Sequence, residues 1–377
     1  MVSMFSLHFF RWAEQLKGCG HEIFWIDVYD SNTKIQEIDF IHQIVGWRTR
    51  WRYPGRYWLK KSWPPVFNFI GYLNNKDLPG FVKQKIREIE PDVIHTFVMQ
   101  SATLPLNGVM AKFPRVKWVY SAWGNDLYFR KQNTKDLNDI KATLPNIDFM
   151  FADCTRDFYL ARDLGFKGKY LGTFPTGGGY VLETTLPYIK NFVEKDCLVI
   201  KGYQGKLGRC NNVLEALLEI KDEVADMKIV LFAVNDEVIK YSRDLGLLNW
   251  NNFEIKPFLT HHEVLKLMGS ARIYIGNSIS DGLPNTLLEA IIMEVFPIQS
   301  NPGGASSELI ASGKNGLLIE HPEDSNHIAS LIKMALANED MLREAIEHNS
   351  KNIRPFLDRN LIKMEVKKQY EYIADSL

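Results

Sequence analysis

The sequence lacks an excess of charge of either sign. Its 377 residues carry 45 Lys and Arg against 45 Asp and Glu, so the formal net charge is zero. Proteins that bind nucleic acid non-specifically depend on cationic surface to neutralise phosphates. The balance therefore disfavours a general nucleic-acid-binding protein and leaves open a local basic patch.

Cysteine is also scarce, and long apolar runs are absent. The four cysteines (Cys19, Cys154, Cys197 and Cys210) form no Cys-x-x-Cys pair, which argues against a disulfide framework or a cysteine metal site. The adjacent His261 and His262 point in different directions on a helix, so we expect no metal site there. No run approaches the ~20 apolar residues of a membrane span, and the start MVSMFSLHFFRW lacks a credible signal sequence. We expect a cytoplasmic protein without a metal or cofactor.

The most informative stretch runs from 273 to 308. A short apolar strand breaks at Gly276 into a polar loop, and a helix follows from Pro284, a residue suited to a first helical position. Leu283 cannot cap that helix through its side chain. The amides of residues 285–287 are therefore expected to be free to hold an anion at the positive end of the helix dipole.

Two carboxylates flank this predicted anion site. Asp281 lies in the loop, and Glu289 is expected to lie off the buried helix face, on the side of Asn285 and Thr286. Carboxylates repel phosphate but accept hydrogen bonds from neighbouring sugar hydroxyls. A second strand-to-helix loop, 301–305, would lie beside the first at the carboxyl edge of a parallel sheet. The pattern predicts a ligand with a phosphate centre and a sugar on each side.

The run Ser278-x-x-Asp281-Gly282-x-Pro284-x-x-x-x-Glu289 and the following Pro-Gly-Gly loop resemble the donor-binding half of glycosyltransferase family 4. Members are retaining, nucleotide-sugar-dependent enzymes of the GT-B fold. Their signature is Glu, seven residues, Glu, and here the first Glu is Asp281. The resemblance implies that Glu289 holds the ribose and Asp281 the transferred sugar. It also implies donor contacts from Ser278, Gly282, Leu283, Asn285, Thr286, Gly303 and Gly304.

Cations for a diphosphate are expected after the strand 197–200. The segment Lys201 to Arg209 resembles the family's Gly-Arg…Lys-Gly segment, which assigns the diphosphate to Lys201 and Arg209, with Lys206 in reserve. The same resemblance places the nucleotide base at the turn containing Phe258. These cations and the helix would take the part of a metal, so we expect none.

The first half of the chain offers fewer catalytic candidates. A helix over 8–16 precedes a strand over 22–28, so only residues 1–7 are available for a first strand, which is either very short or lacks its beginning. His95 ends an expected strand facing the interdomain cleft, although a strand-terminal His more often packs or caps. Trp123-Gly124-Asn125-Asp126 resembles the family's His-Gly-x-Asp segment with Trp in place of His. A catalytic role would then be missing or fall on His95 or Asp126.

The predicted fold is α/β, of the GT-B type, with two Rossmann-like domains facing one cleft. We expect an acceptor-binding domain over 1–180, a linker over 181–196, a nucleotide-sugar-binding domain over 197–357 and a final helix, 358–377, returning to the first domain. The glycines 177–179 favour a hinge over a phosphate cradle.

Basic and aromatic residues alternate over 47–63 without an acid. Aromatic rings settle at the headgroup level of bilayers and cations are drawn to anionic lipid, which favours peripheral attachment to the inner face of the membrane. A solvated loop and a nucleic-acid contact are the alternatives. The predicted membrane patch consists of Arg48, Arg50, Trp51, Arg52, Arg56, Trp58, Lys60 and Lys61.

The predicted activity is transfer of a sugar, with retention, from a nucleotide diphosphate sugar to a hydroxyl of a lipid-linked or cell-surface polysaccharide precursor. A sugar-nucleotide epimerase of the same fold is one alternative, although it leaves the basic aromatic segment unexplained. A catalytically silent sugar-nucleotide-binding or polysaccharide-binding protein is the other, and it draws on the departures at Trp123 and Asp281.

Overall fold

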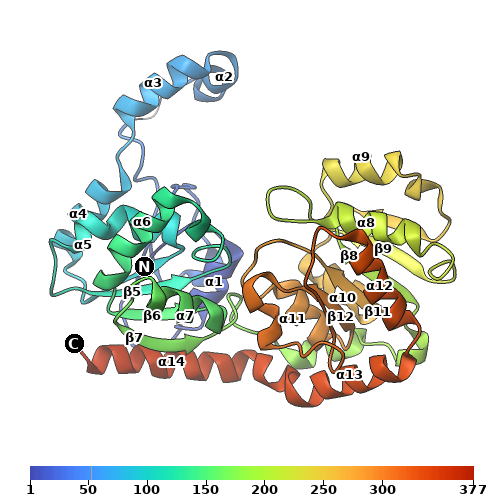
Figure 1. Cartoon of the computed structure of the whole chain (residues 1–377). Coiled ribbons are helices and arrows are strands. Elements are labelled where there is room, and N and C mark those ends of the chain that lie inside the picture. The colour runs from blue at the N-terminus through green and yellow to red at the C-terminus, as the bar shows by residue number, and fades with distance from the viewer. Residues whose placement is uncertain (52) are drawn as a thin grey trace. The chain divides into compact units, whose positions relative to one another are not determined.

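The computed structural model describes residues 1–51 and 53–377. The chain divides into two compact units (Figure 1). The first consists of Met1–Ala152, Asp157–Gly177 and Val366–Leu377, and the second of Asp153–Arg156 and Gly178–Glu365. The short segment Asp153–Arg156 thus belongs to the second unit although its chain neighbours belong to the first.

The first unit contains a seven-stranded parallel sheet in the order β3-β2-β1-β4-β5-β6-β7. The strand β1 has only two residues, yet it pairs with both β2 and β4. The strands are β1 (Val2–Ser3), β2 (Phe24–Asp27), β3 (His42–Ile44), β4 (Val93–Phe97), β5 (Lys117–Ala122), β6 (Phe149–Ala152) and β7 (Lys169–Thr173).

Helices cover both faces of this sheet. Apolar residues of α4, α5 and α6 pack on one face, whereas aromatic residues of α1 and of the end of α14 pack on the other, where Trp12 and Tyr370 lie against Phe151. The helices are α1 (Leu7–Glu14), α2 (Arg56–Ser62), α3 (Pro64–Asn74), α4 (Leu78–Ile89), α5 (Leu104–Met110), α6 (Thr134–Thr143), α7 (Thr155–Asp163) and α14 (Arg359–Asp375).

The second unit contains a six-stranded parallel sheet in the order β10-β9-β8-β11-β12-β13. Side chains alternate along its strands as the pleat requires: Leu198 and Ile200 of β8 face the core under α8 and α12, and Val199 faces the core under α10 and α11. The strands are β8 (Cys197–Lys201), β9 (Lys228–Phe232), β10 (Phe253–Lys256), β11 (Ala271–Gly276), β12 (Phe296–Ser300) and β13 (Leu317–Ile319). The helices are α8 (Cys210–Glu219), α9 (Asp236–Asp244), α10 (His261–Gly269), α11 (Asn285–Ile292), α12 (Ser325–Leu336) and α13 (Glu339–Asn352).

The helix α11 follows the loop that dominates the sequence pattern. It begins at Asn285, and Pro284 is its N-cap residue, with a ψ of 126° that is not helical. The prediction that Pro284 is the first helical residue was therefore wrong by one position. At the other end, the buried Lys195 donates to the carbonyl oxygens of Met293 (3.1 Å) and Glu294 (2.5 Å) and closes the helix.

The second predicted loop-to-helix junction is also different. Instead of an α-helix, two short 3₁₀ turns, Pro302–Gly304 and Ser306–Glu308, follow β12. Gly303 and Gly304 have φ angles of 63° and 86°, which interrupt a regular helix. Within the described residues, no helix is both long enough and apolar enough to cross a membrane.

Candidate functional site

The loops after β8 and β11, two neighbouring strands, are paired with each other. Gly208 forms an antiparallel bridge with Ser278, and the amide of Ile279 donates to the carbonyl oxygen of Leu207 at 2.9 Å. The amide of Arg209 donates to the Asn277 carbonyl oxygen at 3.0 Å. The structure therefore brings the predicted cation segment against the start of the predicted anion loop.

The loop after β12 joins the same edge. The Ser278 amide donates to the hydroxyl of Ser300, the last residue of β12, at 2.9 Å. Gly303 and Gly304 follow with left-handed backbones and no side chain to keep a ligand away from their amides. Three strand-end loops of one parallel sheet thus meet. The sequence order predicted the two loops after β11 and β12, and the family resemblance implied the loop after β8.

Arg156 links two of these loops, a role that no sequence pattern predicted. Its Nη1 donates to the carbonyl oxygens of Asp281 (2.8 Å) and Pro302 (2.7 Å). The carboxylate of Glu308 in turn accepts from the amides of Thr155 and Arg156, each at 2.7 Å. Because charged donors make strong hydrogen bonds, this arginine fixes the spacing of the loops after β11 and β12.

The tip of α11 is only partly as predicted. No side chain caps the helix, and the Thr286 amide makes no hydrogen bond within the described residues. The Leu287 amide, however, donates to the Pro284 carbonyl oxygen at 3.0 Å, so its assignment as an anion donor was wrong. The extended ψ of Pro284 closes a tight first turn and consumes that amide.

Glu289 is more enclosed than expected, with 6% of its surface exposed. Its Oε1 lies 2.9 Å from Nε2 of His261, the first residue of α10. The prediction that Glu289 lies off the buried face was wrong because α10 covers this side of α11. Nothing in the spacing of His261 and Glu289 could have indicated the contact, since it joins two helices.

Asp281, which is half-buried, and Gly282, which is buried, lie directly ahead of α11. Asp281 Oδ1 accepts from the Gly282 amide at 2.9 Å. A Cβ added to Gly282 would lie 2.2 Å from Oδ2 of Asp153, so only glycine fits at this position. Leu283 follows, half-buried, and packs against the core beneath α11.

The side chain of Thr286 is hydrogen bonded to the buried Tyr274. The Tyr274 hydroxyl donates to Thr286 Oγ1 at 2.7 Å. Burial raises the pKa of Tyr274, so this hydroxyl keeps its proton and remains a donor. The contact orients Thr286 beside the open helix tip.

The predicted cations have different surroundings. Lys201 ends β8 and lies 5.7 Å from the ring of Tyr203, and Lys206 is exposed. The Arg209 guanidinium donates to Glu323 at 2.7 Å and to the carbonyl oxygens of Gly205 and Gly208. The exposed partner Glu323 contributes only ~0–1 kcal/mol by pairing, so a diphosphate could compete for Arg209.

Phe258 lies between β10 and α10, close in sequence to His261. Its side chain is 82% exposed. An exposed aromatic ring offers a stacking surface, which agrees with its predicted use for a nucleotide base.

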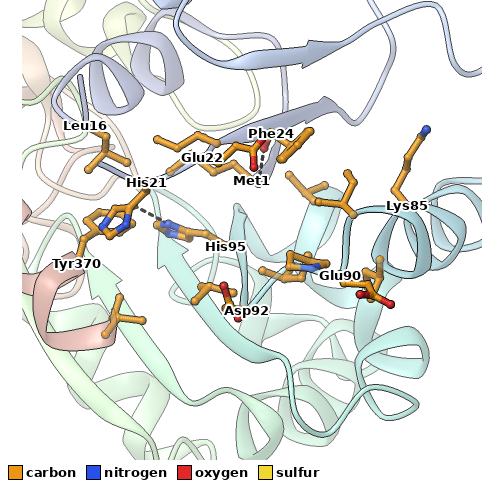
Figure 2. Close-up of a pocket in the computed structure, with 18 of the residues that line it drawn as sticks. Met1, Leu16, His21, Glu22, Phe24, Lys85, Glu90, Asp92, His95 and Tyr370 are labelled. Carbon is orange, nitrogen blue, oxygen red and sulfur yellow. Dashed lines mark hydrogen bonds between the residues drawn. The ribbon is translucent and has the colours of Figure 1, made fainter. Parts of the chain in front are cut away.

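His95 does not end a strand. It lies in the middle of β4, 2% exposed, with Nδ1 2.8 Å from the Tyr370 hydroxyl and Nε2 2.8 Å from the Ser121 hydroxyl. Burial holds its pKa well below 6.5. Figure 2 shows it beside a cavity at the starts of β1, β2 and β4. The cavity has a volume of about 490 Å³ and lies at the edge of the first unit's sheet where these strands begin. The prediction of a cleft-facing His95 was wrong because β4 continues to Phe97.

Asp126 is enclosed as well. Its Oδ2 accepts from the amides of Met99 (2.9 Å) and Trp123 (3.1 Å) and from the Tyr120 hydroxyl (3.0 Å). Burial outweighs these donors and raises its pKa to about 7. The carboxylate ties the loop after β4 to the loop after β5, which gives it a positioning role. Its catalytic role stays a prediction.

Part of the second unit matches a known family profile. Residues 203–352 match the profile of the family described as Glycosyl transferases group 1. The matched segment lies within the second unit. The predicted resemblance is confirmed at this level. A comparison with curated protein sequences returned no match.

Solved structures extend the likeness to the whole chain. Sucrose-phosphate synthase from Thermosynechococcus elongatus aligns with a TM-score of 0.70 and 16% identity over 100% of this chain and 99% of that one. HepE from Anabaena, solved in complex with UDP, gives 0.68 and 13% over 100% and 99%. A glycosyltransferase from Rickettsia africae gives 0.64 and 15% over 99% and 98%. The predicted GT-B fold is confirmed.

The residues of the predicted membrane patch lie outside the segment that matches group 1, before and within α2. Trp51 is 49% and Trp58 64% exposed, Arg56, Lys60 and Lys61 belong to α2, and Arg48 and Arg50 precede it. Arg52 lies outside the described residues. Trp47, the first aromatic residue of the segment, is buried and stacks on Phe81 at 4.5 Å, so it contributes nothing to a surface.

Proposed function

We propose that the chain is a retaining glycosyltransferase that moves a sugar from a nucleotide diphosphate sugar to a hydroxyl acceptor. The observation that carries the proposal is the meeting of three strand-end loops around an uncapped helix tip beside the enclosed carboxylate of Glu289. The group 1 match lies on this same region. Open α/β sheets bind ligands at this edge.

Each part of the donor meets a group of suitable chemistry. The Thr286 amide, with the helix dipole of α11, faces the diphosphate, and Lys201, Lys206 and Arg209 supply positive charge. Glu289, oriented by His261, accepts from the ribose hydroxyls. Asp281 accepts from the transferred sugar, and Phe258 stacks on the base.

The charges matter most as the leaving diphosphate gains negative charge. A helix dipole contributes roughly 0.3–2 kcal/mol toward an anion, whereas micromolar affinity requires about 8 kcal/mol. Charge-assisted hydrogen bonds of about 1.5–3 kcal/mol each supply much of the difference. Preorganised cations and amides at that position also lower the barrier, so the mechanism we propose needs no metal or cofactor.

The first unit would bind the acceptor, which we propose to be a lipid-linked or cell-surface polysaccharide precursor at the inner face of a membrane. Uridine diphosphate sugars are the first donors to test, because HepE was solved with UDP and with UDP-glucose. Asp126 would keep the loops after β4 and β5 in register for that acceptor.

The test is incubation with radiolabelled UDP-, GDP- and ADP-sugars and a membrane lipid extract. We expect label to appear in the lipid fraction with retained anomeric configuration. A new free nucleotide sugar would indicate an epimerase instead. Tight binding without either product would indicate a silent binding protein, as the Trp123 and Asp281 departures would then explain.

A further inference from the structure

Residues 53–73 form a helical arm whose base is fixed to the first unit. The chain enters at 48–51 and leaves at 74–76, and these two segments are hydrogen bonded as an antiparallel pair. The Arg50 amide donates to the Asn74 carbonyl oxygen at 2.9 Å, and the Lys76 amide donates to that of Arg48 at 2.7 Å. The buried Asn74 side chain bonds both backbone groups of Trp51. The arm therefore has a defined root.

The arm itself buries no apolar side chain. Figure 1 shows α2 and α3 projecting away from the other helices of the first unit. The helix α2 has no buried residue, and in α3 only Asn74, at the root, is buried. A helix of a globular protein normally buries an apolar stripe. Here the stripe of α3, Val66, Phe69 and Leu73 at spacings of three and four, is 38%, 64% and 48% exposed. Tyr57, Trp58, Trp63 and Tyr72 add exposed aromatic surface of 89%, 64%, 59% and 84%.

Positive charge surrounds this apolar surface. The sequence from 40 to 76 contains no Asp or Glu, although the whole chain is neutral. At the root, an open groove of about 350 Å³ is lined by Arg48 and Lys76 together with Phe67 and Tyr72. The one carboxylate lining it, Asp77, accepts from the Gly80 amide at 2.8 Å and caps α4. The arm is thus matched to a partner that is anionic and apolar.

We infer that the arm inserts into an anionic bilayer surface. The apolar face of α3 would enter the interface, with Trp63 and Tyr72 near its two ends at headgroup level, where such rings are enriched. Arg56, Lys60 and Lys61 of α2 and the root groove would meet headgroup phosphates. A second copy is a poorer occupant, because pairing two identical arms places cations opposite cations without an acid to compensate.

The inference deepens the proposed function by naming the surface on which the acceptor is presented, and it rests on that proposal only for the acceptor. Attachment through the arm itself requires neither donor nor catalysis. An experiment can therefore show failure of membrane attachment separately from failure of the proposed glycosyl transfer.

The experiment is co-sedimentation of the full chain with phosphatidylcholine vesicles that contain or lack phosphatidylglycerol, without any nucleotide. We expect binding that requires the anionic lipid and weakens with salt. Lys60→Gln with Lys61→Gln is expected to lower the partition coefficient about thirtyfold, since each basic residue near the surface contributes about 1 kcal/mol, or roughly a fivefold step. Phe69→Ser is expected to lower it at least about tenfold.

Matched controls lie on exposed sites of the second unit. Lys240→Gln with Lys314→Gln makes the same charge change, and Phe356→Ser, at 68% exposure, makes the same apolar change. Both should bind vesicles as the parent does, and all variants should keep the parent's melting temperature. Equal loss in arm and control variants, or no binding to anionic vesicles, overturns the inference. Self-association that Phe69→Ser abolishes, measured by analytical ultracentrifugation without vesicles, would assign the arm to a second copy instead.

Discussion

Glu289→Ala is expected to weaken binding of the nucleoside diphosphate about 10- to 150-fold. The Glu289 carboxylate is 6% exposed and is held by His261 at 2.9 Å, so it is preorganised to accept from ribose hydroxyls. A hydrogen bond to a charged group contributes about 1.5–3 kcal/mol, which corresponds to this range for one bond lost. Isothermal titration of the parent and the variant measures the difference.

Two further variants make the result specific. Glu347→Ala removes an exposed carboxylate of α13 that pairs with Lys351, and it should bind as the parent does. His261→Ala leaves Glu289 in place but unoriented, so we expect a smaller loss than for Glu289→Ala. Parent-like affinity in a correctly folded Glu289→Ala protein would refute the ribose assignment.

Asp126→Ala is expected to destabilise the chain by about 3–5 kcal/mol. The substitution leaves two amides and a phenol hydroxyl without their buried acceptor, and each orphaned donor costs about 1–3 kcal/mol. Asp126→Asn keeps an oxygen that can accept from the same donors and removes the buried charge, so it should cost far less. Urea unfolding of the three proteins at pH 7 measures the difference.

The pH dependence of this effect has a definite sign. Burial raises the pKa of Asp126 from 3.8 to about 7, so the folded chain retains a proton over a range in which the unfolded chain has lost it. The contribution of Asp126 to stability is therefore complete below pH 4 and decreases as the pH rises to 7, by roughly 4 kcal/mol at ~1.4 kcal/mol per pH unit. The stability of Asp126→Asn relative to the parent should increase across this interval. A constant difference, or Asn as harmful as Ala, would contradict this account.

The architecture of the second unit could be predicted because its strands and helices repeat apolar residues at clear periods. Parallel strands place successive loops at one edge, so the meeting of the loops after β11 and β12 could be predicted, whereas the place of Arg209 was implied by the family resemblance. These are local or topological properties that a single sequence carries.

The errors arose where a long-range contact decides the outcome. The hydrogen bond from Arg156 to the Asp281 carbonyl oxygen and the contact of His261 with Glu289 join residues far apart in the sequence. Neither contact produces a repeating pattern of residues from which it could be predicted. His95 was misplaced because a polar residue in mid-strand resembles a strand end until its buried partners are known. Trp47 and Trp51 belong to the same run of basic and aromatic residues, so the sequence does not distinguish them. Only the structure shows that Trp47 stacks on Phe81 and is buried.

The helix α3 was missed for a different reason. Its sequence, PPVFNFIGYLN, begins with two prolines and has no charged face, so it lacks the alternation that marks an amphipathic helix. Its exposure to solvent is visible only in the structure. The sequence thus indicated the basic and aromatic residues of α2 but not the exposed apolar face of α3.

The central claim is that the loops after β8, β11 and β12 form the nucleotide-sugar site. Amide hydrogen exchange of the full chain, with and without whichever of UDP, GDP and ADP raises its melting temperature most, tests it directly. The account predicts slower exchange at 202–209, at 277–289 and at 301–308, with the Thr286 amide among the most protected. Protection confined to the first unit, for example around the cavity beside His95, would contradict it.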